Sequence, residues 1–199
     1  PINLYGATKF CSDKLFVAAN NLSGMHDTRF SIVRYGNVAG SRGSVIPYFK
    51  ELINNGKKVL PITDKNMTRF SITLDEGVKF VAETLVNMTG GEIVVPKLPS
   101  LKIINLVPAL GENLKYKIVG TRPGEKLHEV MIPEDEIRNT VDMGNYYIIQ
   151  PSYHWWNVSS FKKNIEKQSK PLKITSEYSS GNNDVWLSKK QIVQLLKNI

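Results

Sequence analysis

The feature that most limits the fold of this chain is a buried-strand pattern followed at once by a glycine- and serine-rich loop. Residues 29–35 hold Phe, Ile, Val and Tyr in one short run, and residues 36–44 follow with three Gly and two Ser. A helical pattern over residues 4–20 precedes the run. In open α/β sheets, ligands bind outside the carboxyl ends of the strands. The pattern therefore predicts an α/β protein with a ligand site at the 36–44 loop.

The rest of the chain alternates between helical and strand-like segments. Thr73 and Ser188 each begin a capping-box match, which is typical of a helix start, and Ser100 is a candidate N-cap. The predicted helices cover residues 45–54, 73–88, 100–106, 124–131 and a final helix from 188 onward. The predicted strands cover residues 58–62, 68–72, 92–95, 115–119 and 145–149. The organisation expected from this pattern is a main part over residues 1–150 and a C-terminal arm with a final helix over 151–199.

Tyr5 and Lys9 form a pair that indicates chemistry. Residues four apart lie on the same face of a helix, so the phenol and the ammonium can reach one site. A nearby ammonium favours the phenolate form of a tyrosine, which is what a tyrosine acid or base needs near neutral pH. Alone the pair is a weak signal, because most such pairs are surface residues.

Composition and charge exclude several classes of protein. The net charge is +8, but it divides into +3 over residues 1–150 and +5 over residues 151–199, mostly as scattered lysines, so no nucleic-acid partner is predicted. No run of about 18 apolar residues occurs, so no membrane partner is predicted. The single cysteine, Cys11, is expected to be a buried small hydrophobe. With one Cys and no Cys/His cluster, no metal site is predicted.

Four motifs in this order carry a resemblance to a known family. They are the Tyr5/Lys9 pair and the runs RYGNV at 34–38, MTRF at 67–70 and RPGEKLHE at 122–129. Together they resemble the extended short-chain dehydrogenase/reductase superfamily. Within it, the chain is most similar to the inverting UDP-N-acetylglucosamine 4,6-dehydratases of bacterial nucleotide-sugar pathways.

The resemblance implies a Rossmann-like fold with a smaller substrate-binding part, truncated at the N-terminus. It also implies an enzyme, a hydro-lyase that makes a 4-keto-6-deoxy sugar for bacterial surface glycans or flagellin. The implied cofactor is NADP, with NAD as the alternative, bound by Tyr5, Lys9 and Val38. Tyr5 and Lys9 are the implied catalytic residues: Tyr5 takes the proton of the C4 hydroxyl, and Lys9 binds the nicotinamide ribose. The implied setting is a cytoplasmic homo-oligomer.

The resemblance also implies a set of residues that bind the UDP-sugar. Asn37 contacts the nucleotide sugar, although turn chemistry also explains an Asn in such a loop. Arg69 and Arg122 hold the diphosphate, although a surface ion pair would also explain Arg69. Glu125 accepts hydrogen bonds from the ribose hydroxyls or, alternatively, interacts favourably with a helix dipole. The remaining implied contacts are Thr63 for the uridine and, for the uracil and ribose, Val45, Ile46, Pro47 and Tyr48, which a helix start with core residues would also explain.

The chain lacks two sequence features that are typical of the family. It has no Gly-x-Gly-x-x-Gly phosphate-binding turn, and the family's Thr-Asp-Lys stretch would fall before Pro1. We therefore expect this chain alone to be inactive. The sequence leaves open a UDP-sugar 4-epimerase, a retaining dehydratase and a non-catalytic UDP-sugar-binding fragment. The run His154-Trp155-Trp156 is interpreted as packing rather than as a stacking platform.

Overall fold

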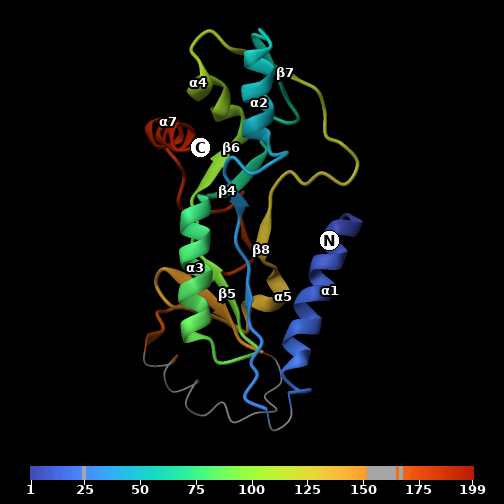
Figure 1. The fold of residues 1–199 in the computed structure, drawn as a ribbon, viewed down its shortest axis with the longest axis vertical. Helices are drawn as coiled ribbons and strands as arrows, with labels where there is room; N and C mark the ends of the chain where they lie inside the picture. The colour runs from blue at the N-terminus through green and yellow to red at the C-terminus, as the bar shows by residue number, and fades with distance from the viewer. Residues whose placement is uncertain (24–25, 152–164, 166–167) are drawn as a thin grey trace. The chain divides into compact units, whose positions relative to one another are not determined.

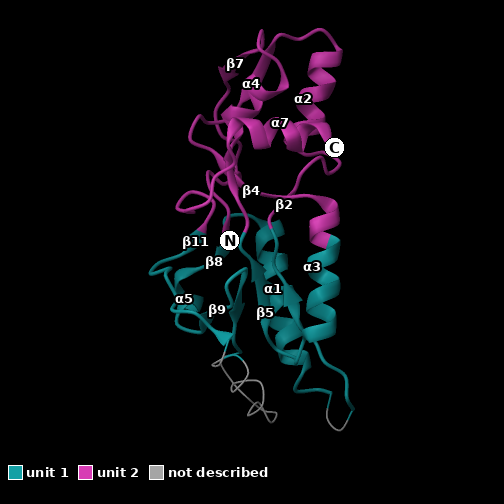
Figure 2. Ribbon diagram, turned by 90° about the vertical axis from the view of Figure 1, so that its left-hand side faces the viewer, with its two compact units in different colours: residues 1–35, 78–97, 131–178 teal, residues 36–77, 98–130, 179–199 magenta. Residues whose placement is uncertain are grey.

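The computed structural model describes residues 1–23, 26–151, 165 and 168–199, so His154-Trp155-Trp156 lies outside the described residues. The chain forms two compact units, and each unit is built from three separate segments (Figure 2). Unit 1 comprises residues 1–35, 78–97 and 131–178, and unit 2 comprises residues 36–77, 98–130 and 179–199. The chain passes between the units after Tyr35, Gly77, Lys97, Val130 and Tyr178. The unit boundary therefore falls within α3 (Leu74–Asn87), β8 (Val130–Ile132) and β11 (Tyr178–Ser179).

Unit 1 is built on a four-stranded mixed sheet, and Figure 1 shows β5 between α3 and α1. The strands in spatial order are β1 (Ile32–Val33), β5 (Ile93–Pro96), β10 (Tyr146–Ile149) and β9 (Thr140–Asp142). β1 runs parallel to β5, whereas β10 runs antiparallel to both of its neighbours. Every residue of β5 is buried, which explains its unbroken apolar sequence.

Helix α1 (Leu4–Ala19) confirms the predicted helix, but none of its residues is buried. Asn3 caps the helix by accepting a hydrogen bond from the Gly6 N–H at 2.7 Å. Leu4 and Leu15 are 81% and 70% exposed, and Cys11 is also exposed, so the prediction of a buried Cys11 was wrong. Polar side chains make several of the helix's long-range contacts, and the Phe16 ring lies 6.2 Å, centroid to centroid, from the Phe30 ring.

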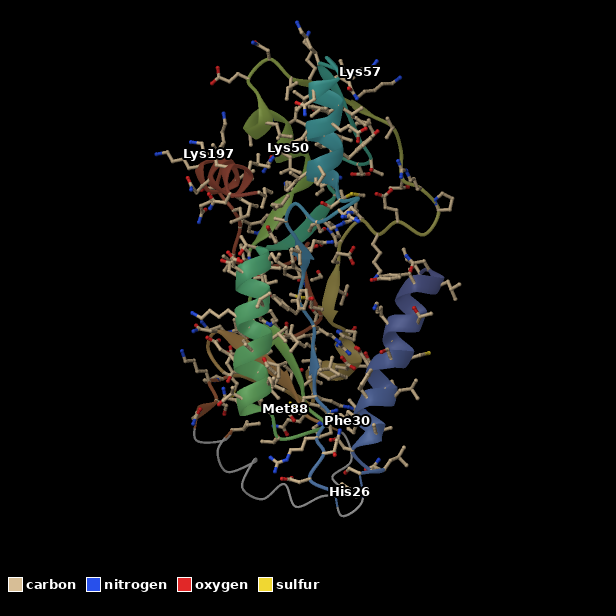
Figure 3. All side chains as sticks on the ribbon, viewed as in Figure 1. His26, Phe30, Lys50, Lys57, Met88 and Lys197 are labelled. Atoms are coloured by element: carbon tan, nitrogen blue, oxygen red, sulfur yellow. The ribbon has the colours of Figure 1, made fainter. Side chains whose placement is uncertain are left out.

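Asn20, which ends α1, illustrates these polar contacts. Its side-chain amide donates to the Phe30 carbonyl oxygen at 2.9 Å and accepts from the Phe30 N–H at 3.0 Å. Figure 3 labels Phe30 at this end of the helix. One asparagine therefore joins the end of α1 to the segment that leads into β1.

Unit 2 contains a three-stranded and a two-stranded sheet. The strands in order are β2 (Asn37–Val38), β4 (Thr68–Ile72) and β6 (Ser100–Lys102), with β3 (Val59–Ile62) and β7 (Lys115–Ile118) in the second sheet. The helices are α2 (Val45–Asn54), the 3-10 turn η1 (Ile103–Asn105), α4 (Leu106–Leu110) and α7 (Lys189–Lys197). The β2–β4 and β3–β7 pairs are parallel, as expected for the predicted α/β class.

A single apolar cluster holds these elements of unit 2 together. Phe49 of α2, Leu60 of β3, Leu106 of α4 and Ile192 of α7 are at most 1% exposed within it. Lys50 of α2, labelled in Figure 3, also donates to the Leu196 carbonyl oxygen at 3.3 Å. The final helix therefore packs as part of the core of unit 2.

The local rules of helix capping succeeded at two positions and failed at a third. Both predicted capping boxes are present, with the Thr73 N–H donating to Glu76 at 2.8 Å and the Ser188 N–H donating to Gln191 at 2.9 Å. Ser100 does not begin a helix, so that prediction was wrong. It lies in β6, and its N–H donates to the Val185 carbonyl oxygen at 2.8 Å, a long-range partner that a local pattern cannot reveal.

A buried ion cluster joins α1 to β1 and to α5 (Glu134–Ile137) in unit 1. The Arg34 guanidinium lies 2.6 Å from Glu136 and 2.8 Å from Asp13, and Lys14 lies 3.0 Å from Glu136. The Glu136 side chain is 8% exposed. Burial raises the pKa of Glu136, but the hydrogen bonds and charges of Arg34 and Lys14 outweigh burial and hold it below its ordinary value.

No helix within the described ranges is both long enough and apolar enough to cross a membrane.

Replacing Glu136 with Gln should lower the free energy of unfolding by about 3 kcal/mol, because it leaves the buried Arg34 with one carboxylate fewer. Folding lowers the Glu136 pKa, so the ionised carboxylate stabilises the folded state fully above pH 4.5. This stabilisation is lost as the pH falls through the pKa that Glu136 has in the folded protein. Urea denaturation at several pH values measures both effects.

The matched control is Glu83→Gln, whose exposed partner Lys79 lies 3.9 Å away. It should change stability by less than about 0.5 kcal/mol. Equal effects of the two substitutions at neutral pH would contradict the role given to the cluster.

Candidate functional site

A cavity of about 240 Å³ lies within unit 2, and it gathers most of the residues that the sequence predicted as ligand contacts. This volume is slightly below the range from about 300 Å³ that is usual for small-molecule sites, so the cavity can enclose part of a nucleotide sugar. The predicted residues that line the cavity are Asn37, Val38, Val45, Ile46, Thr63, Arg69 and Glu125. Pro47, Tyr48 and Arg122 are not among its lining residues.

Close packing of the backbone fixes the loop that forms one wall. Gly36 lies so near β4 that a Cβ atom there would come within 2.5 Å of the Phe70 Cβ atom. The next residues form β2, with Asn37 opposite Ser71 and Val38 opposite Ile72. This pairing brings the loop over residues 36–44 to the carboxyl end of a parallel strand, where ligands bind in open α/β folds.

A tight turn over residues 122–125 presents Glu125. The Glu125 N–H donates to the Arg122 carbonyl oxygen at 3.0 Å, and Gly124 has a φ of 79°. Pro followed by Gly suits a type II turn, which needs a positive φ at its third residue. The Glu125 carboxylate accepts from the Arg122 N–H at 3.1 Å and from the Thr63 hydroxyl at 3.4 Å.

This turn corrects the prediction of a helix over residues 124–131. The segment runs from the turn into β8, and the structure assigns no helix to it. The carbonyl oxygens of Lys126 and Leu127 accept from the Arg69 guanidinium at 2.9 and 3.1 Å. These carbonyl groups thus face a long-range side-chain donor, which the pattern of the sequence did not reveal.

Arg69 is largely engaged by the protein itself. Besides these two bonds, its guanidinium donates to the Thr68 carbonyl oxygen at 2.7 Å and lies 3.5 Å from Glu129. Burial lowers the pKa of Arg69, and the Glu129 and Glu125 carboxylates offset only part of this. Contact between Arg69 and a diphosphate stays a prediction, since three main-chain oxygens already accept bonds from its guanidinium.

Tyr5 and Lys9 lie on one face of α1 in unit 1, as their spacing predicted. The Lys9 ammonium lies 5.4 Å from the centroid of the Tyr5 ring, and Tyr5 is 72% exposed. An ammonium at this distance is within cation–π range of the ring. The phenol and the ammonium are therefore available together on an open helix surface.

Several cavity residues were not predicted as ligand contacts. Pro61, Phe70 and Ser71 lie on the strands predicted over residues 58–62 and 68–72, whose apolar pattern was the only signal available, and the others lie elsewhere in unit 2. These lining residues include Pro61, Met67, Phe70, Ser71, Leu101, Ile103 and Leu106.

Unit 1 has a larger cavity, of about 320 Å³, lined in part by Lys14, Asn21 and Arg138. Lys14 there is paired with Glu136, and none of the residues predicted as ligand contacts lines this cavity. We place the ligand site in unit 2, because its cavity combines apolar walls with Thr63, Arg69 and Glu125. Among the described residues, no group of three or more His, Cys, Asp or Glu could hold a metal ion.

Fold and site together define a class of protein. Parallel strand pairs, a glycine loop at a strand end, and a Tyr/Lys pair on a helix are typical of a Rossmann-like α/β protein. The chain belongs to the polysaccharide biosynthesis protein family, whose model matches residues 1–151.

Individual relatives support this assignment. The chain is 53% identical over 200 residues to a Campylobacter jejuni protein named UDP-N-acetylglucosamine 4,6-dehydratase (inverting), covering 100% of this chain and 60% of that protein. It is 34% identical over 186 residues to a Rickettsia canadensis UDP-glucose 4-epimerase, and the match covers 92% of this chain and 53% of that protein. The resemblance expected from the motifs is thus confirmed, and the chain spans about 60% of the length of the curated dehydratase that it matches.

A solved structure confirms the fold class. The X-ray structure of Pen from Bacillus thuringiensis matches with a TM-score of 0.81 and 32% identity, covering 100% of this chain and 58% of that one.

Replacing Gly36 with Ala should destabilise the protein by about 2 kcal/mol, because the new methyl group would overlap the Phe70 side chain and push β2 from β4. Chemical denaturation measures the change. The control is Gly77→Ala within α3, where the nearest atom to the new Cβ is 3.9 Å away. That change should stabilise the helix by up to about 1 kcal/mol, so a Gly36 variant as stable as the Gly77 variant would refute the close approach.

Proposed function

We propose that the full-length protein is a C5-inverting UDP-N-acetylglucosamine 4,6-dehydratase, which makes a UDP-4-keto-6-deoxy-hexosamine for a bacterial surface glycan or for flagellin. The observation that carries the proposal is 53% identity, over the whole chain, to a relative of that name. The 34% identity to the 4-epimerase is much lower. The cavity in unit 2 adds support, since predicted UDP-sugar contacts gather there.

In this proposal, unit 2 binds the UDP-sugar. The Glu125 carboxylate, already oriented by the Arg122 N–H and the Thr63 hydroxyl, accepts hydrogen bonds from ribose hydroxyls. The Arg122 and Arg69 guanidinium groups suit the diphosphate, because their planar forks match phosphate oxygens. Asn37 binds the sugar, and the apolar wall packs against uracil and ribose through Val45 and Ile46. Pro47 and Tyr48, which do not line the cavity, are proposed as further contacts of the uracil and ribose.

Tyr5 and Lys9 are the proposed catalytic residues, and with Val38 they are also the proposed contacts to a nicotinamide cofactor. The fit rests on their chemistry, since a phenol and an ammonium lie together on the exposed start of α1. When bound, NADP, or alternatively NAD, would supply hydride transfer. Tyr5 accepts the proton of the sugar C4 hydroxyl, and Lys9 supports the phenolate with its charge. Lys9 would also donate a hydrogen bond to the ribose of the bound cofactor.

The later steps follow from the chemistry of the C4 ketone. The ketone makes the C5–H acidic, so a base removes that proton and water leaves from C6. The hydride taken from C4, which the bound nicotinamide cofactor would hold, would then add to C6 and make the methyl group. A proton delivered to the opposite face of C5 would invert that centre. We assign neither this acid nor this base to a residue named above, and we propose that the enzyme is a cytoplasmic homo-oligomer.

A UDP-sugar 4-epimerase is the second candidate, and the observation that favours it is the identity to the Rickettsia relative. An epimerase would need the same proton transfer at C4, but it would leave C6 unchanged. The two candidates therefore share their predicted binding residues and differ in their product.

Replacing Tyr5 with Phe in the full-length protein should lower turnover of UDP-N-acetylglucosamine by about 10² to 10⁴-fold, since it removes the group that moves the C4 proton. UDP binding should stay within about twofold of wild type, because Tyr5 is not needed to hold the nucleotide. Initial rates and calorimetric titration measure the two quantities. The control is Tyr116→Phe on β7, which is 51% exposed, and turnover by Tyr5→Phe as fast as by this control would remove Tyr5 from the mechanism.

Replacing Arg122 with Ala should weaken UDP binding about tenfold or more, through loss of a charged contact to the diphosphate. Affinity for uridine, which has no phosphate, should fall much less. Arg29→Ala, which removes the same charge from an exposed pair with Asp27 in unit 1, serves as the control. If Arg122→Ala binds UDP as tightly as this control does, the diphosphate assignment fails.

A further inference from the structure

Ser180 is a fully buried residue that lies beside the turn segment of the nucleotide site in unit 2. Its N–H donates to the Glu129 carbonyl oxygen at 2.8 Å. Its hydroxyl accepts from the Glu129 N–H at 2.9 Å. One residue from the C-terminal part of the chain thus binds both main-chain groups of Glu129, the last residue of the 122–129 motif.

The same hydroxyl also reaches the start of β4. Ser180 Oγ lies 2.7 Å from Thr68 Oγ1 and donates to the Thr68 carbonyl oxygen at 3.2 Å. Thr68 Oγ1 in turn lies 2.7 Å from His128 Nδ1. We call Thr68, His128 and Ser180 the hydroxyl bridge. Thr68 is 2% exposed and Ser180 is 0% exposed, so both hydroxyls depend on these protein partners.

The hydrogens of the hydroxyl bridge can be arranged for either histidine tautomer. With Nδ1 unprotonated, the Thr68 hydroxyl donates to His128 and the Ser180 hydroxyl donates to Thr68. With Nδ1 protonated, His128 donates to Thr68, the Thr68 hydroxyl donates to Ser180, and Ser180 donates to the Thr68 carbonyl oxygen. Both arrangements satisfy the inventory of donors and acceptors, so the bridge is a constant structural link.

Gly181 fixes the imidazole that completes the bridge. A Cβ atom at this position would lie 2.7 Å from Cγ and 2.8 Å from Nδ1 of His128. The backbone of the C-terminal segment therefore rests directly against the ring. His128 is held on one side by this backbone and at Nδ1 by the Thr68 hydroxyl.

The hydroxyl bridge acts on the residues that hold the ligand. Thr68 is the residue before Arg69, and the Thr68 N–H donates to the Leu127 carbonyl oxygen at 3.0 Å. Arg69 donates to carbonyl oxygens of the same segment. That segment directly follows the turn that presents Glu125. Fixing Thr68 and Glu129 therefore fixes the spacing between Arg69 and Glu125.

We propose that Ser180 and Thr68 are positioning residues for the nucleotide site, and that the C-terminal segment preorganises the 122–129 motif for UDP through the hydroxyl bridge. This inference rests on the proposed function for its ligand. The two residues act through Arg69 and Glu125. Rigid placement of ligand-binding groups before binding raises affinity by reducing the ordering that binding requires.

The test compares UDP affinity and amide hydrogen exchange in the full-length protein and in two variants. Ser180→Ala removes one hydroxyl, and Thr68→Val removes the other at nearly equal volume. Each should weaken UDP binding about tenfold, as expected for loss of a preorganising contact. Each should also speed exchange of the 126–129 amides about tenfold or more without UDP present. In turnover assays KM should rise while kcat changes by less than about twofold, because Tyr5 and Lys9 are untouched.

Two variants serve as matched controls. Ser179→Ala removes a neighbouring buried hydroxyl that bonds to Asn182 within the C-terminal segment at 2.9 Å. Thr68→Ser keeps the bridging hydroxyl. Both controls should bind UDP within about twofold of wild type. If Ser180→Ala does not fold, the comparison of Thr68→Val with Thr68→Ser decides the question.

The outcomes separate this inference from the proposed function. Wild-type protein that fails to bind UDP contradicts the proposed function. If the wild-type protein binds UDP, but Ser180→Ala and Thr68→Val both leave UDP affinity and exchange of the 126–129 amides unchanged, the role of the hydroxyl bridge is overturned. A loss of affinity in Ser179→Ala equal to that in Ser180→Ala would overturn it too, since the effect would then be one of general packing.

Discussion

The hydrogen bond from the Thr68 N–H to the Leu127 carbonyl oxygen is the contact on which the site in unit 2 depends. It joins β4 to the segment that follows the Pro-Gly turn, so it brings together two parts of the chain that are far apart in sequence. β4 also pairs with β2 through Ser71 and Ile72. One strand therefore sets the positions of the glycine loop, of Arg69 and of Glu125.

Burial of charge is the second constraint, and the two units use it differently. In unit 1, Arg34 is matched by two carboxylates, Glu136 and Asp13, so a buried cation is compensated by anions. In unit 2, Arg69 is held mainly by main-chain oxygens, with Glu129 at 3.5 Å. The first arrangement suits an element that must stay fixed, namely α1 with Tyr5 and Lys9. The second leaves a partly compensated cation at a cavity wall, where an anionic ligand would add the missing negative charge.

How much of the fold could be predicted depended on the range of the interactions. The bounds of β4 and α2 agreed with their residue patterns. Both capping boxes formed, because capping chemistry acts within a few residues. Ser100 and the 124–131 segment were predicted as helical and are not. Their hydrogen-bond partners, Val185 and Arg69, are distant in sequence, and no local rule contains them.

The residues of the candidate site also divide into those that local motifs reveal and those that only long-range contacts reveal. Residues within recognisable motifs, such as Asn37 and Glu125, line the cavity, and their contact with a UDP-sugar stays a prediction. Ser180 lies in a polar stretch with no motif, so its contacts with Thr68 and Glu129 became visible only in the structure. The prediction of a buried Cys11 failed because no residue of α1 is buried. The contacts of α1 to the rest of unit 1 include polar ones through Asp13 and Asn20.

The most direct test of the central claim is proton NMR of the full-length protein incubated with UDP-N-acetylglucosamine. The account predicts a new methyl doublet from C6, with couplings that report an inverted C5. A product with a changed C4 configuration and no methyl signal would contradict the dehydratase and establish an epimerase. An unchanged sugar that still shows saturation transfer from the protein would contradict catalysis and leave UDP-sugar binding alone.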